Sequence, residues 1–262
     1  MLKNATPPAN TISRMTVRDT VEVLGCRIDR LDMDATVRRA QQAVASREYV
    51  QHVCVNAAKL VTVHTDPQMR AIVAGCEIVS ADGQAVVWAS RLLGDPLPER
   101  VAGVDLMFRL FALAEQENYS VYILGAQRSV LDQAIANLRV AHPGIVVAGS
   151  RDGYFDASEQ EAVAADIRAS QADLLFVAIS SPMKEHFLGT YGPGLGVPFV
   201  MGVGGAVDIL AGVTRRAPMA WQRLGLEWLY RIVQEPRRMV RRYVVTNVKF
   251  LALLLRAMAR RD

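Results

Sequence analysis

The chain has 262 residues, of which 51% are hydrophobic and 21% charged, a balance typical of a globular protein with a well-buried core. Its three cysteines and four histidines are scattered, which argues against a disulfide framework or a structural metal and favours a reducing cytosol. The net charge of +4 is unevenly divided, because residues 215–262 hold 12 Lys/Arg against 3 Asp/Glu and so carry +9, which leaves −5 on the rest. A mildly acidic body with a basic tail indicates a polyanionic partner or an anionic membrane surface.

Residues 1–20 contain no apolar run and are expected to form a flexible leader, neither a signal peptide nor a membrane anchor. Beyond them, short runs rich in Val and Ile alternate with helical patterns. The predicted strands are 21–26, 51–55, 77–80, 119–124, 145–149, 173–179 and 197–201. The predicted helices are 35–47 capped by Asp34, 57–75 with a break at Pro67, 104–117, 128–141, 157–170 starting at Asp156 with Glu159, 183–190 and 206–211. This alternation predicts an α/β, Rossmann-like catalytic domain over 21–214, with a mainly parallel sheet flanked by helices.

Residues 215–262 are predicted to form a helical appendage that is basic and amphipathic. One side of a helical wheel carries Val240, Val244, Leu251, Leu254, Leu255 and Met258, and the opposite side carries Arg238, Arg242, Lys249, Arg256 and Arg260. Charges interrupt every apolar stretch, so a transmembrane span is not expected. A helix packed on the body with its charges in water is the ordinary alternative, but the terminal position and the charge favour a helix that lies on a membrane surface.

Two segments follow predicted strands, at the edge of the sheet where ligands of α/β proteins usually bind. Asp82 follows strand 77–80 and is well placed to act as a general base, with capping of the next helix as the structural alternative. Gly204 and Gly205 belong to the run Gly-Val-Gly-Gly after strand 197–201. Glycines there let backbone N–H groups approach a phosphate, although plain strand-to-helix packing explains them equally well.

Two cations lie in comparable places. Arg100 precedes helix 104–117 and is suited to neutralising a phosphate, with a surface ion pair as the alternative. Lys184 follows strand 173–179 and would face a ligand above the sheet, unless it is simply solvated. The pair Asp32 and Asp34 resembles the Asp-x-Asp that binds a divalent cation in many sugar-nucleotide transferases, but it has no partner carboxylates. Helix capping by Asp34 explains that pair better, so no metal site is predicted.

Several segments together resemble one bacterial enzyme family. They are VNAAKLV at 55–61, SADGQAVVWASRLLGDPLPERVAGVDL at 80–106, YILGA at 122–126, GYF at 153–155, Ser-Ser-Pro in 180–185, GVGGAVDILAG at 202–212, RAP at 216–218 and GLEWLYRIVQEPRR at 225–238. Their order and specificity resemble the WecG/TagA/CpsF glycosyltransferases, also called glycosyltransferase family 26, over roughly residues 20–245.

The resemblance implies an inverting, UDP-sugar-dependent hexosyltransferase of cell-envelope or exopolysaccharide biosynthesis. Such enzymes move a sugar, typically N-acetylmannosamine, onto a saccharide carried by undecaprenyl diphosphate at the cytoplasmic face of the cell membrane. Asp82 matches the catalytic base, and Asn56, Arg100 and Asp208 match positions associated with the donor nucleotide and the active site. The tail residues Arg231, Arg238 and Arg241 match arginines thought to hold the lipid diphosphate. Arginines and helix N-termini would neutralise the leaving UDP, so no cofactor and no metal are expected.

Two departures from the family pattern concern the sugar. Cys54 stands where the family usually has Thr, and Lys184 stands where it usually has Gln. Both positions border the expected sugar site, so glucose or a relative is an alternative donor sugar. The acceptor sugar, the linkage and a homo-oligomer stay open.

Two other classes of protein compete with this interpretation. An α/β oxidoreductase would use the glycines at 202–205 for a nicotinamide cofactor, but the chain lacks the early Gly-rich turn and the acidic residue that follows it. A non-enzymatic module that binds nucleic acid through its basic tail is disfavoured, because few aromatic residues interleave with the arginines and the other face is apolar.

Overall fold

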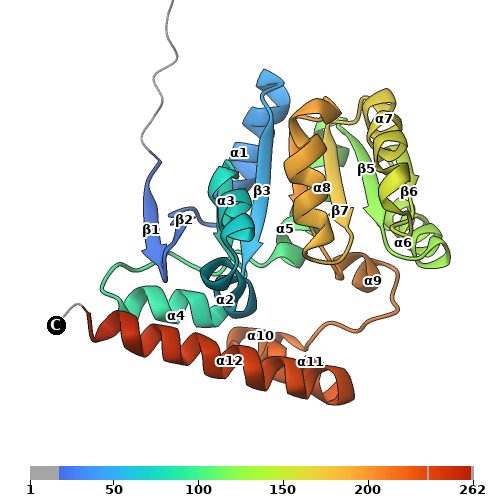
Figure 1. Ribbon diagram of the computed structural model, residues 1–262. Coiled ribbons are helices and arrows are strands. Elements are labelled where there is room, and N and C mark those ends of the chain that lie inside the picture. The colour runs from blue at the N-terminus through green and yellow to red at the C-terminus, as the bar shows by residue number, and fades with distance from the viewer. Residues whose placement is uncertain (1–17, 235, 261–262) are drawn as a thin grey trace, which may run out of the picture.

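The computed structural model describes residues 18–234 and 236–260, and its main element is a six-stranded sheet (Figure 1). The strand order is β4-β3-β8-β7-β5-β6, and every neighbouring pair is parallel. The strands are β3 (Val50–Val55), β4 (Ile78–Ala81), β5 (Ser120–Gly125), β6 (Val146–Arg151), β7 (Leu174–Ala178) and β8 (Phe199–Gly202). The prediction of an α/β protein with a parallel sheet between helices is confirmed.

Helices cover both faces of this sheet. They are α1 (Met33–Ser46), α2 (Ala57–Thr65), α3 (Pro67–Gly75), α4 (Gln84–Leu92), α5 (Gly103–Glu117), α6 (Arg128–Ala141), α7 (Gln160–Ser170), α8 (Met183–Tyr191), α9 (Ala206–Leu210), α10 (Met219–Arg223), α11 (Glu227–Gln234) and α12 (Pro236–Met258), with 3-10 turns η1 (Ala157–Glu159) and η2 (Gly192–Leu195). Side chains on a strand alternate between faces, and β5 illustrates this. Val121 and Ile123 pack with α1, α5, α6 and α9, whereas Tyr122 and Leu124 pack with α7 and α8.

A third cluster of buried residues closes the β3–β4 end of the sheet. It joins α2, α3 and α4 to a separate antiparallel hairpin formed by β1 (Thr20–Val23) and β2 (Cys26–Asp29). The sequence predicted one strand over 21–26, and that prediction is wrong in extent because the chain reverses at Leu24 and Gly25. Both residues have positive φ, 54° and 81°, as a two-residue hairpin turn requires.

Local signals at helix ends account for most of the boundaries. Asp66 accepts hydrogen bonds from Gln68 and Met69 N–H at the start of α3, so the predicted break at Pro67 separates two helices. The start predicted at Asp156 is also confirmed, since Asp156 and Glu159 form a reciprocal capping box.

The cap predicted for the first helix is wrong by two residues. Asp32, and not Asp34, accepts the hydrogen bond from Ala35 N–H at the start of α1. Asp34 lies inside the first turn and pairs with Arg109 of α5 at 2.6 Å. Either carboxylate is compatible with a helix start, so the sequence alone did not decide between them.

The C-terminal segment forms a helical appendage as expected, on the side of the sheet toward which its strands point (Figure 1). Phe250 and Leu254 of α12 are buried in the cluster that includes α2 and α4. Leu254 and, in part, Met258 were predicted to belong to the apolar stripe that lies on the membrane, but both pack on the body. None of the helices in the described ranges is both long enough and apolar enough to cross a bilayer.

Candidate functional site

The carboxyl ends of three neighbouring strands bring most of the predicted donor-site residues and Asp82 together. Asn56 directly follows β3, Asp82 directly follows β4, and Gly204 and Gly205 lie in the turn after β8. The register pairs Val55 of β3 with Ala81 of β4, so the residues that follow them are neighbours. A Cβ atom added to Gly83 would lie 3.3 Å from Cβ of Asn56, which shows how closely the two strand ends approach.

Asp82 does not cap the helix that follows it. The N-cap of α4 is Gly83, and no side chain caps that helix. Instead, Asp82 Oδ1 accepts a 3.0 Å hydrogen bond from Gly103 N–H, the first residue of α5. The partial positive charge at a helix N-terminus stabilises the ionised form of a carboxylate, which is the form that a general base needs.

Cys54 lies beside this carboxylate, one residue before the end of β3. A Cβ atom on Gly103 would be only 3.1 Å from Sγ of Cys54, so the N-terminus of α5 packs against the thiol. Burial raises the pKa of the Cys54 thiol, and the negative charge of Asp82 raises it further. The thiol therefore stays protonated at neutral pH and is not a nucleophile.

Asn56 has a structural role that its position after a strand did not reveal. Its side-chain oxygen accepts a 3.0 Å hydrogen bond from Lys59 N–H and caps α2. This bond fixes the side chain next to Asp82 at the edge of the sheet.

The glycine turn and Asp208 are close together. Gly204 has a φ of +52°, a conformation that side chains disfavour. A Cβ atom on Gly205 would lie 3.4 Å from Oδ2 of Asp208, which is in the first turn of α9. Asp208 thus lies against the turn that follows β8.

Lys184 comes from the opposite face of the sheet and reaches the same edge. It lies in the first turn of α8, is 8% exposed, and its side chain runs across Gly202 at the end of β8. Its nearest acidic neighbour is Glu185, with Nζ and Oε1 3.7 Å apart. The sequence-based alternative of a solvated lysine is therefore wrong.

Arg100 is engaged with the C-terminal appendage. Its Nη1 donates to Oε2 of Glu227 in α11 at 2.9 Å, and both side chains are largely buried. Glu227 Oε1 also lies 3.6 Å from Nε of Arg216, which in turn makes two hydrogen bonds to Asp105 of α5. This ion network of Arg100, Glu227, Arg216 and Asp105 ties α11 to α5. The sequence allowed an ion pair for Arg100 but could not name its partner, because Arg100 and Glu227 are 127 positions apart and Asp105 and Arg216 are 111 apart.

The predicted acceptor-binding arginines belong to the appendage. Arg231 is in α11, and Arg238 and Arg241 are in the first part of α12, but their side chains lie outside the described part of the structure. Their proposed contact with a diphosphate therefore stays a prediction.

The outer side of α12 carries an apolar stripe that the body leaves uncovered. We call it the α12 stripe; its members are between 43% and 64% exposed and are Val240, Val244, Val248, Leu251 and Leu255. Positions four and three apart share one side of a helix, so these residues form a continuous band. Further exposed apolar side chains lie on α4 and α11, namely Trp88, Leu92, Trp228 and Val233.

In the part of the chain that the structure describes, no three His, Cys, Asp or Glu side chains gather as a metal site requires.

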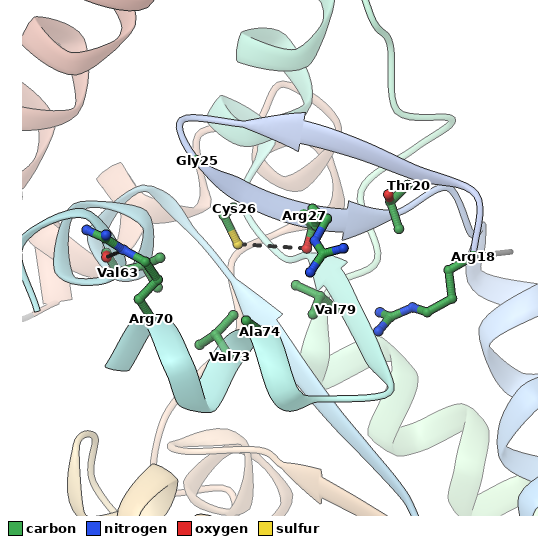
Figure 2. A pocket seen from close by; sticks show the side chains of 10 residues that line it. All are labelled: Arg18, Thr20, Gly25, Cys26, Arg27, Val63, Arg70, Val73, Ala74 and Val79. Carbon is green, nitrogen blue, oxygen red and sulfur yellow. Dashed lines mark hydrogen bonds between the residues drawn. The ribbon is translucent and has the colours of Figure 1, made fainter. Parts of the chain in front are cut away.

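A cavity of about 470 Å³ lies between the β1–β2 hairpin and α3, with Arg18 and Arg70 at opposite ends and Val73 and Val79 between them (Figure 2). Its lining includes none of the predicted site residues.

A parallel sheet whose carboxyl edge collects a carboxylate, a buried cation and a glycine turn has the architecture of a ligand-binding α/β enzyme. The family model described as "Glycosyl transferase WecG/TagA/CpsF family" matches residues 21–262, nearly the whole chain, and the protein belongs to this family. It is therefore a glycosyltransferase of cell-surface polysaccharide synthesis, an enzyme that transfers a sugar from a donor to an acceptor.

Proposed function

We propose that the protein transfers a sugar from a UDP-sugar to a saccharide linked to undecaprenyl diphosphate, with inversion at the anomeric carbon. The observation that carries this proposal is the position of Asp82, whose carboxylate is held at the sheet edge by Gly103 N–H. Asp82 accepts the proton of the acceptor hydroxyl while the hydroxyl oxygen attacks the anomeric carbon. The bond between that carbon and UDP breaks, and UDP leaves with the electron pair.

The donor would occupy the edge formed by β4, β3 and β8. Asn56, Asp208 and the backbone of Gly204 and Gly205 surround this edge, and Lys184 supplies a positive charge there. We propose N-acetylmannosamine or glucose as the transferred sugar and no requirement for a metal ion. The cations near the site, including Arg100 once it is released from Glu227, would balance the charge on the departing UDP.

The appendage would bring the enzyme to its lipid-linked acceptor as a peripheral protein on the inner face of the cell membrane. The α12 stripe is apolar and exposed, and Lys249, Arg256 and Arg260 are exposed on the same helix. An exposed apolar band with flanking cations suits the surface of an anionic bilayer. Arg231, Arg238 and Arg241 would then lie on the segment nearest the acceptor diphosphate.

A transfer assay with the full chain tests this proposal. A panel of UDP-sugars is incubated with a polyprenyl-diphosphate-linked acceptor, and product is measured for the parent, Asp82→Asn and Asp132→Asn. Asp132 is an exposed carboxylate on α6 and serves as the matched control. We expect Asp82→Asn to lower turnover by about 100- to 10,000-fold, the usual contribution of a general base, with UDP binding retained. Normal turnover in Asp82→Asn would refute the assignment, and transfer from no UDP-sugar would refute the proposed donor.

A further inference from the structure

Three charged side chains form a buried cluster between α2 and α8, beside the proposed donor site. Lys59 Nζ is 2.5 Å from Glu185 Oε1, and Lys184 Nζ is 3.7 Å from the same oxygen. Burial alone would raise the pKa of Glu185, but the charges of Lys59 and Lys184, with a smaller contribution from a Ser181 hydrogen bond, lower it to about 2. The carboxylate is therefore ionised, and two ammonium groups share its single negative charge.

The ammonium group of Lys184 is the less satisfied of the two. Its distance to Glu185 exceeds that of a normal hydrogen bond, whereas Lys59 makes a short one. Burial lowers the pKa of Lys184, and the neighbouring positive charge of Lys59 lowers it further. A desolvated cation with a shared counter-ion gains much from an incoming anion, because the anion replaces the water that burial removed.

The contact with Gly202 places the Lys184 side chain at the edge of the sheet. A Cβ atom on Gly202 would lie 2.6 Å from Lys184 Cε and 3.2 Å from Nζ, so a larger residue at the end of β8 would force the end of this side chain to move. The ammonium group therefore lies at the carboxyl end of β8, the strand that pairs with β3.

The proposed base lies on the other side of β3. Asp82 follows β4, and the strand order β4-β3-β8 separates it from the end of β8 by two strand spacings, about 10 Å. In an inverting displacement, the attacking oxygen and the leaving group are on opposite sides of the anomeric carbon. A sugar ring held over β3, with Asp82 on one side, would therefore present its leaving group toward Lys184.

We propose that Lys184 binds the diphosphate of the UDP donor and stabilises it as it departs, and that Glu185 and Lys59 are positioning residues that hold Lys184 in place. This inference rests on the proposed function and assigns the leaving-group side of that same site. The contact to the diphosphate is then ionic, between the ammonium group of Lys184 and phosphate oxygens.

The binding of uridine, UMP and UDP, measured by titration calorimetry, separates a phosphate contact from any other. We expect Lys184→Gln to weaken UDP binding by about 10- to 100-fold, as the loss of one charged hydrogen bond does, and to leave uridine binding unchanged. An equal loss for uridine and UDP, or no loss for UDP together with a higher KM for the UDP-sugar, would overturn the proposal. The second result would place Lys184 on the sugar. A protein that binds UDP with the expected ratio but transfers no sugar would contradict only the proposed function.

The positioning roles need a variant in which Lys184 itself is intact. Gly202→Ala introduces the Cβ that collides with Lys184, and Gly189→Ala on α8, where a Cβ meets only Ile72 at 3.6 Å, is its matched control. We expect the loss of UDP affinity in Gly202→Ala to approach that of Lys184→Gln, and Gly189→Ala to bind UDP as the parent does. Parent-like UDP binding in Gly202→Ala would show that the position of Lys184 against Gly202 is not needed for its contact with the diphosphate.

Glu185→Gln tests the counter-ion with a pH profile. Lys184 is influenced by the charges of Lys59 on α2 and Glu185 on its own helix, and the neighbouring Cys54 thiol on β3 stays protonated at neutral pH. Without the Glu185 charge, Lys184 loses its proton more easily. As the pH is raised from neutral, UDP affinity should therefore begin to fall at a lower pH in Glu185→Gln than in the parent. A variant that is less stable but keeps the parent's pH profile would reduce Glu185 to a structural role; if it does not fold, the Gly202→Ala comparison decides.

Discussion

Replacing Glu227 should loosen the C-terminal appendage, because this one carboxylate bridges two arginines of different segments. Its Oε2 is 2.9 Å from Arg100 Nη1 and its Oε1 is 3.6 Å from Arg216 Nε, and its side chain is 17% exposed. Breaking a fully buried ion pair costs about 3–5 kcal/mol, and one hydrogen bond to a charged group contributes about 1.5–3 kcal/mol. Because some water reaches the carboxylate, we expect Glu227→Gln to lower the free energy of unfolding by about 1.5–3 kcal/mol.

Thermal unfolding measures this effect, which corresponds to a decrease in Tm of roughly 3–10 °C for a chain of this size. Glu161→Gln on α7 is the control, since that carboxylate is exposed and should change stability by less than about 0.5 kcal/mol. A double-mutant cycle with Arg100→Met should give a coupling energy of at least about 1 kcal/mol. A Tm for Glu227→Gln equal to that of the control, or strict additivity with Arg100→Met, would refute the bridging role.

Three further predictions concern separate regions. Asp82→Ala should be less stable than Asp82→Asn by about 1 kcal/mol in thermal unfolding, because only Asn keeps an acceptor for Gly103 N–H; equal stability would contradict the hydrogen bond. Burial lowers the pKa of His52 from 6.5 to about 3, so the unfolded chain binds this proton first. The stability that His52 contributes is complete above pH 6.5 and should fall by about 1.4 kcal/mol per pH unit below it, whereas His52→Gln should lack this component in denaturant titrations. Leu251→Asp should reduce sedimentation with anionic vesicles without lowering Tm. Val140→Asp, at an even more exposed apolar position on α6, should not; equal binding by both would exclude the α12 stripe as the contact surface.

Elements that depend on neighbouring residues could be predicted from the sequence. The break at Pro67 and the helix start at Asp156 each depend on a capping residue within three positions. The buried strands are recognisable as short runs rich in Val and Ile. The β1–β2 hairpin was missed because β2 has only four residues, Cys26–Asp29, and includes a buried Asp. Asp29 is tolerated there because Arg18 and Val79 N–H bind its carboxylate from 11 and 50 positions away.

The candidate site also combines features that neighbouring residues determine with features that only the packing of distant segments determines. The position of Asp82 followed from its place after a strand, and the parallel sheet then brought it beside Asn56. The pairing of Lys59 with Glu185 spans 126 positions, and that of Asp105 with Arg216 spans 111. Pairings over such distances are set by how the layers pack, and no local pattern in the chain encodes them.

The first turn of α5 contacts both the proposed catalytic base and the C-terminal appendage. Gly103, at its start, holds the carboxylate of Asp82, and Asp105, two residues later, holds Arg216 at the root of the appendage. One rigid helical turn therefore serves as a common support for the proposed base and for the C-terminal segment. A displacement of that segment would move Asp105 and, through three consecutive backbone residues, Gly103. The orientation of the Asp82 carboxylate therefore depends on the position of the appendage.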